Sequence, residues 1–191
     1  MKTATETLRK EHDAILRMLD ASDEVANRLQ RDEQVAPEVL GGLLEFFQLF
    51  ADRCHHGKEE DLLFPLLEKK GLPRSGGPLA VMLHEHTLGR ALVRQMAQAT
   101  QEFAAGQPVA GRRWAEAARE YGGLLRAHIQ KENNILFVMA ERMLSDEEQT
   151  GLTEAFEKVE DEKMGPGTHE RLHGVMAHIL SEVFSEASAS R

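Results

Sequence analysis

Two ten-residue stretches of the chain repeat one pattern: HHGKEEDLLF at residues 55–64 and HIQKENNILF at residues 128–137. Each begins with histidine, has lysine three places later and glutamate at the fourth place, and ends in an apolar pair followed by phenylalanine. Residues i and i+4 of a helix share a face, so each stretch presents an imidazole beside a carboxylate. The repetition indicates either two helices with similar core-facing patterns or the two halves of one metal site.

A second match occurs at almost the same spacing along the chain. The quoted stretches lie 73 residues apart (128 minus 55), and Glu11-His12 matches Glu85-His86 at 74 residues (86 minus 12). A helix pair therefore occurs twice, and an approximate two-fold axis would bring equivalent faces together in the centre of one bundle. Each copy contributes one lone histidine and one His-x-x-x-Glu, which gives six candidate metal ligands. They are His12, His55, Glu59, His86, His128 and Glu132.

The spacing of apolar residues predicts the fold class. Apolar residues recur three and four places apart, which indicates an all-α fold. Proline and glycine runs divide the predicted helices, which are 3–31, 37–70, 78–105, 110–143, 146–163 and 168–186. Four long helices with short linkers favour an up-down-up-down four-helix bundle over residues 1–143. Residues 144–191 are expected to form a C-terminal helical pair packed on the bundle, because a separate domain of that size would be marginal.

Several residues mark the ends of these helices. Pro37 and Pro78 stand where a first helical residue tolerates a missing N–H, and Ser145 with Glu148 forms a capping-box pattern. Pro65 lies inside the second predicted helix, so we expect a kink or a shortened helix there. The proline follows both ligand positions of the first stretch, whose turn should therefore stay intact.

Composition limits the partners of the protein. The formal net charge is −9 and basic residues are not clustered, which argues against binding to nucleic acid. A single cysteine, Cys54, excludes an intrachain disulfide framework. Neither an apolar leader nor a stretch of membrane-spanning length occurs in the sequence. We expect a cytoplasmic protein without a membrane partner.

The candidate ligands suggest a pair of metal ions. A carboxylate has two oxygens and can bridge two ions, so Glu59 and Glu132 are the candidate bridges. The two-fold relation assigns one histidine pair to each ion: His12 with His55, and His86 with His128. With an oxide or hydroxide bridge, each ion would have five ligands and one open position. Imidazole and carboxylate ligands without thiolate suit iron, manganese or zinc.

The alternative is a polar bundle interior without metal. A lone histidine on an apolar face is usually structural, and an isolated His-x-x-x-Glu is often an ordinary surface pair. A set of four inward histidines and two matched glutamates is different from either isolated feature, because burying that many polar groups without partners is costly. The duplicated context therefore favours the metal pair.

Neighbouring residues receive structural roles. Cys54 and His56 flank His55 and are expected on other faces of the helix, as structural or supporting residues. Lys58 and Lys131 are expected off the ligand face, in solvent. The phenylalanines that end both stretches are expected in the core.

Two other features have alternative interpretations. Tyr121 lies seven residues before His128 and so shares its interior stripe; it is either a core tyrosine or a hydroxyl donor to a bound oxygen species. His169 and His173 form an i,i+4 pair with His178 further on, and could bind an adventitious ion.

In order and context, the ligand candidates resemble the hemerythrin-like family, in particular its HHE cation-binding branch, over about residues 5–142. The resemblance implies a non-haem di-iron site with an oxo or hydroxo bridge, in which Glu59 and Glu132 bridge and the four histidines are terminal. Oxygen-carrying hemerythrins have a fifth histidine where this chain has Met82, and His-x-x-x-x-Asp where it has His128 and Glu132. The missing histidine implies a more open second iron. The six-ligand pattern is similar to that of di-iron proteins of nitrosative stress and iron-centre repair, without their small cysteine-containing domain.

The leading hypothesis is a di-iron protein that binds or reduces oxygen, peroxide or nitric oxide in sensing or stress defence. The alternative is a module for iron storage, delivery or sensing without turnover, whose C-terminal helices offer a surface to a protein partner. A zinc-bound hydroxide would instead permit hydrolysis.

Overall fold

The computed structural model describes residues 3–159, 165 and 167–185, and every regular element in these ranges is helical. The elements form six rods: α1 (Ala4–Gln30); α2 (Pro37–Phe46) with η1 (Phe47–His56), η2 (Glu59–Leu63) and α3 (Phe64–Lys69); α4 (Gly77–Ala104); α5 (Val109–Lys131) with η3 (Glu132–Leu136) and α6 (Phe137–Met143); α7 (Asp146–Val159); and α8 (Thr168–Ser185). The six predicted helices are confirmed; their predicted parts at 160–163 and 186 lie outside the described residues.

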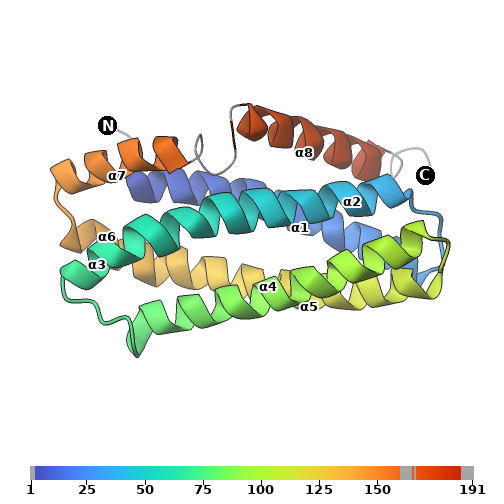
Figure 1. Ribbon diagram of the computed structural model, residues 1–191, viewed down its shortest axis with the longest axis horizontal. Helices are drawn as coiled ribbons and strands as arrows, with labels where there is room; N and C mark the ends of the chain where they lie inside the picture. Colours follow the sequence, from blue (N-terminus) through green and yellow to red (C-terminus); the bar gives the residue numbers. More distant parts are fainter. Residues whose placement is uncertain (1–2, 160–164, 166, 186–191) are drawn as a thin grey trace.

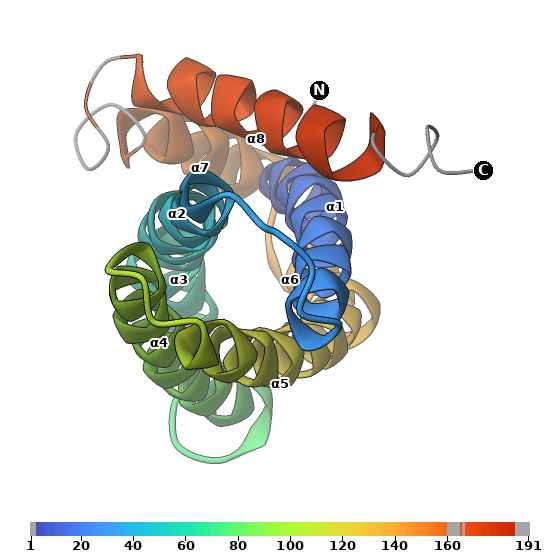
Figure 2. The same cartoon turned by 90° about the vertical axis from the view of Figure 1, so that its right-hand side faces the viewer.

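The first four rods surround a common axis in chain order, which confirms the up-down-up-down bundle (Figures 1 and 2). Helices α7 and α8 lie outside this ring along α1 and the second rod (Figure 2). α7 contacts α1 and η2, and α8 contacts α1 and α2. Within the described part of the chain, no helix is long and apolar enough to cross a membrane.

The helix ends follow the signals in the sequence. Thr3 and Glu6 form a capping box at the start of α1. Before α7, the Ser145 N–H donates to Glu148 at 2.9 Å and the Glu148 N–H donates to the Ser145 hydroxyl at 3.3 Å, which confirms the predicted capping box. Pro37 opens α2, where its missing N–H leaves no helical hydrogen bond unmade.

Two apolar clusters fill the bundle, and a layer of histidine and glutamate separates them. Along α1, Leu8 belongs to one cluster, Ile15 belongs to the other, and His12 lies between. Along the second rod, Phe50 and Leu63 take the two flanking places. The polar layer is therefore enclosed by packed side chains on both sides.

The second and fourth rods widen into π-helical turns at equivalent places. η2 begins at Glu59 and η3 at Glu132, and the N–H of the phenylalanine after each turn donates to the carbonyl of that glutamate. Pro65 does not cause this turn, because Val138 takes the same place in the second copy (65 plus 73). The sequence predicts only a kink or a shortened helix at Pro65, and these wider turns were not predicted. Single π turns inside α-helices are frequent at functional sites.

Candidate metal centre

All six candidate ligands meet in the buried layer, each with at most 1% of its surface exposed. The Nε2 atoms of His12 and His55 lie 2.9 Å apart, and those of His86 and His128 lie 3.1 Å apart. The ring centroids are 4.6 Å apart at 61° in the first pair and 4.7 Å apart at 61° in the second. The structure thus forms the two predicted histidine pairs in matching geometry; their binding of metal stays a prediction.

Each glutamate lies between the two pairs. Glu59 places one oxygen 3.6 Å from Nε2 of His55 and the other 3.4 Å from Nε2 of His86. Glu132 likewise places its oxygens 3.2 Å from His12 and 3.1 Å from His128.

Neither glutamate is satisfied by protein donors. None of the four oxygens of Glu59 and Glu132 has an aligned hydrogen bond, although both side chains are fully buried. A buried carboxylate without a donor is costly, and a cation removes that cost. The layer therefore fits two bridged cations.

Two further glutamates fix the proton on one histidine of each pair. His55 Nδ1 lies 2.9 Å from Glu11, and His128 Nδ1 lies 2.9 Å from Glu85. Burial alone would raise the pKa of Glu11, but hydrogen bonding to His55 and the charge of Lys58 lower it to about 2. An ionised carboxylate only accepts hydrogen bonds, so these Nδ1 atoms carry protons, and in the neutral ring the lone pair then lies on Nε2.

The other histidine of each pair has the same arrangement. His12 Nδ1 lies 2.9 Å from the side-chain oxygen of Asn133, and His86 Nδ1 lies 2.7 Å from Glu60. Asn133 and Glu60 are again 73 residues apart (133 minus 60). When both rings of a pair are neutral, their two Nε2 lone pairs face each other, and a cation between them removes the repulsion. Hydrogen-bonded Nδ1 with Nε2 directed at the ion is the usual arrangement of metal-binding histidine.

We call the side chains that accept from the histidine Nδ1 atoms the outer layer. The lysines of the quoted stretches contact two of its glutamates. Lys58 is fully buried and donates to Glu11, so the prediction that it lies in solvent was wrong. Lys131 donates to Glu85 with 37% of its side chain exposed. The signal was present in the sequence, because both copies keep the same glutamate and lysine, which solvated residues would not require.

The repeated phenylalanines lie in the core, as predicted, and also contact the ligands. The ring of Phe137 stacks on His12 with centroids 5.4 Å apart at 7°, and the ring of Phe64 stacks on His86 at 6.0 Å and 15°. These contacts help fix the ring planes of one histidine in each pair.

Metal-ligand atoms gather into two groups of four, within 4.8 Å of one another in each group, among the described histidine, cysteine, aspartate and glutamate side chains. One group is His12, His55, Glu59 and Glu132; the other is His56, Glu59, His86 and His128. The prediction that His56 faces away from the site was therefore wrong.

Other candidates lie apart from these groups. Tyr121 lies in an apolar cluster, its ring 5.0 Å from that of Phe47, and burial together with the charge of Asp52 raises the pKa of its phenol. Cys54 is buried and belongs to neither group. The ring of His173 lies against Phe50, and the side chain of His169 lies outside the described residues. The roles predicted for Tyr121 and the last helix stay untested.

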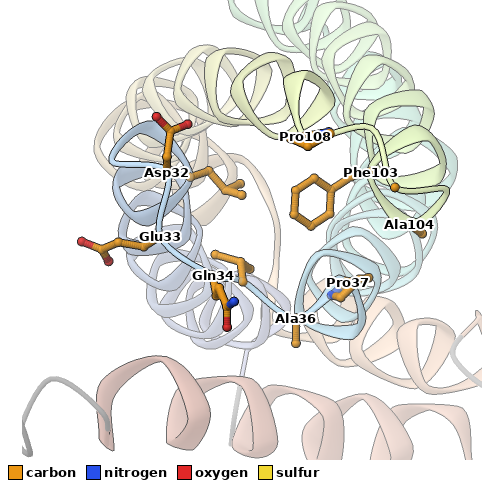
Figure 3. Close-up of a pocket in the computed structure, with 11 residues that line it drawn as sticks. Asp32, Glu33, Gln34, Ala36, Pro37, Phe103, Ala104 and Pro108 are labelled. Carbon is orange, nitrogen blue, oxygen red and sulfur yellow. The ribbon is translucent and has the colours of Figure 1, made fainter.

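A pocket of about 630 Å³ opens where the loop after α1 meets the loop between α4 and α5 (Figure 3). Phe103, Pro37 and Pro108 line it together with the turn that contains Asp32 and Glu33 (Figure 3). It shares no residue with the two ligand groups and is not the metal centre.

Comparison with known proteins agrees with this geometry. The family model described as the hemerythrin HHE cation binding domain matches residues 3–140. The chain belongs to this hemerythrin HHE family. Its two ligand groups lie within the matched residues.

The chain is also similar to two curated proteins at low identity. The uncharacterized protein Rv1995 of Mycobacterium tuberculosis is 28% identical over 163 residues, which cover 85% of this chain and 63% of that protein. The iron-sulfur cluster repair protein YtfE of Salmonella newport is 32% identical over 124 residues, covering 60% of this chain and 54% of that protein. The chain thus spans less than two thirds of the length of either relative. No solved structure gave a significant match.

The metal-free protein is expected to lose stability as the pH rises from about 6.5 to about 9. Burial alone would lower the pKa of His86, but the adjacent carboxylates of Glu59, Glu60 and Glu132 raise it from 6.5 to about 9. A raised pKa stabilises the fold fully below the unfolded value, and this contribution is lost as pH passes the folded value. Thermal melts of chelator-stripped protein across this range measure the decline. Melting temperatures that rise instead would contradict it.

Proposed function

We propose that the protein holds a non-haem di-iron centre that binds or reduces a small oxidant (oxygen, peroxide or nitric oxide) in sensing or stress defence. The observation that carries this proposal is the pair of buried, unsatisfied carboxylates, Glu59 and Glu132, each directed at both histidine pairs. Ligation by imidazole and carboxylate without thiolate suits iron. Bound iron would supply one-electron chemistry and a coordination position for the oxidant.

The protein residues prepare the site for this chemistry. Glu11 and Glu85 hold their histidines in the ligating tautomer and make the imidazoles more basic. Lys58 and Lys131 balance these outer carboxylates. The apolar clusters on both sides keep bulk water away, which strengthens each electrostatic contact.

Relatives support an iron-linked role. The Salmonella protein is named for iron-sulfur cluster repair, and its match to this chain covers 54% of its own length. We therefore carry over only the link to iron, and propose small-oxidant chemistry rather than repair itself.

An iron-sensing module without turnover is the second candidate, because α7 connects the outer layer of the site to the surface. The ammonium of Lys58 lies 5.8 Å from the ring centroid of Phe156 on α7, and the N–H of Ala4 donates to Gln149 at 3.1 Å. A partner that displaces α7 would uncover the lysine and Glu11, and so alter the environment of His55.

Ligand-dependent absorption of the iron-loaded protein tests the proposal. The ferric protein should show ligand-to-metal charge-transfer bands that shift on adding azide or peroxide, and nitric oxide should change the spectrum of the ferrous protein. The module without turnover would be favoured if azide, peroxide and nitric oxide all left the spectra unchanged while a chelator removed the iron readily.

A further inference from the structure

His56 has the geometry of a metal ligand, although the matched pattern of the family does not use this position. It is 3% exposed, and its ring stacks on that of His86 with centroids 3.9 Å apart at 18°. Its Nδ1 lies 3.3 Å from Asp52, whereas its Nε2 is buried and has no hydrogen-bond partner.

The surroundings of His56 match those of the other histidines. Every candidate ligand histidine has an oxygen acceptor at Nδ1, and Asp52 is that acceptor for His56. Arg90 donates to Asp52 at 2.8 Å and to Glu60 at 2.7 Å, and Glu60 in turn accepts from His86. One guanidinium thus fixes the acceptors of both stacked rings. A histidine with only a packing role would not need this outer layer.

We propose that His56 is a fifth histidine ligand, which joins His86 and His128 on one of the two metal ions. This inference rests on the proposed two-metal site. The position at which oxygen-carrying hemerythrins have a fifth histidine is Met82 in this chain, and Met82 packs in the apolar cluster beside the layer. His56 supplies the missing imidazole from the second rod instead of from α4.

The π-helical winding of η1 allows this arrangement. Adjacent residues of a π-helix are separated by a smaller angle than in an α-helix, because the turn contains more residues. His55 and His56 end this segment, and both rings reach the buried layer, with centroids 5.7 Å apart.

A fifth histidine makes the two metal positions unequal. The residue equivalent to His56 in the second copy is Ile129, which is apolar (56 plus 73). The ion between His12 and His55 therefore has two imidazoles and the other ion has three. The position for an exogenous oxidant is expected on the ion held by His12 and His55.

Proton NMR of the cobalt(II)-substituted full chain counts the ligating imidazoles directly. Each histidine bound through Nε2 gives one hyperfine-shifted, solvent-exchangeable Nδ1–H resonance. We expect five such resonances in the unaltered protein and four in His56→Gln. In chelator competition, His56→Gln should hold one of its two ions more than about 100-fold less tightly, since loss of an outer-layer partner alone costs about 10–100-fold.

Two further variants serve as controls. His84→Gln removes an exposed histidine from the same region and should keep five resonances and both affinities. Asp52→Asn should keep five resonances while weakening one ion by about 10–100-fold.

The count in the unaltered protein decides the inference even if a variant fails to fold. Four resonances, with none lost in His56→Gln, would overturn it, and absence of bound cobalt would overturn the two-metal site as well. Five resonances without any response of the iron protein to oxidants would leave the ligand role standing and refute the proposed function alone.

Discussion

Changing Glu59 and Glu132 together to alanine is expected to abolish stoichiometric metal binding. Each carboxylate is directed at both histidine pairs, so the double change removes both bridges and leaves only neutral imidazoles. Elemental mass spectrometry of protein purified without a histidine tag from iron-replete cells should show about two metal ions per unaltered chain and none in the variant.

The melting temperature separates this account from a polar interior without metal. Loss of a ligand that binds only the folded state lowers stability, so the double variant should melt below the metal-loaded protein. Without metal, adding a chelator would leave the melting temperature of the unaltered protein unchanged. Glu154→Ala with Glu157→Ala, two exposed positions on α7, is the matched control and should change neither quantity. Full metal content in the Glu59 and Glu132 variant would contradict the account.

Changing Lys58 to methionine is expected to cost about 3–5 kcal/mol of unfolding free energy, because it leaves the buried carboxylate of Glu11 without its cation. Lys131→Met is the matched control from the second copy. Its partner Glu85 reaches solvent more readily and Lys131 is partly exposed, so the cost should stay within about 1 kcal/mol. Urea unfolding of both metal-free variants measures the difference. Equal losses would show that burial of the Glu11–Lys58 pair does not matter.

A paired substitution separates stability from ligand orientation. Glu11→Leu together with Lys58→Met replaces a buried ion pair by apolar side chains, which is often neutral or stabilising. His55 would still lose the acceptor of its Nδ1–H, so metal affinity should fall by about 10–100-fold although the fold is restored.

The sequence predicted the bundle and the six-residue layer because both depend on periodicity. Residues four places apart share a helix face, so His55 with Glu59 and His128 with Glu132 could be placed side by side. The repeat then predicted which helix faces meet, since equivalent faces of a duplicated helix pair come together at the axis. The predicted histidine pairs form in the structure with nearly equal ring geometry.

Regular periodicity was also the reason for the errors. A constant α-helical winding places His56 away from His55, whereas the π-helical segment brings both rings to the layer. Lys58 was expected in solvent, but α7 covers it through Phe156, a contact between residues almost a hundred places apart. Neither the π turns nor the position of α7 follows from the local pattern. Only one feature of the sequence indicated the outer layer. Both copies have a glutamate directly before the lone histidine, and both have the same lysine in the quoted stretch.

Anomalous diffraction at the iron absorption edge, from crystals of protein purified without added metal, tests the central claim most directly. The account predicts two iron peaks about 3.5–4 Å apart, with Glu59 and Glu132 in contact with both. One of them should lie beside His12 and His55, and the other beside His86 and His128. Crystals with no anomalous peak between the two carboxylates, or with a single metal ion there, would contradict it.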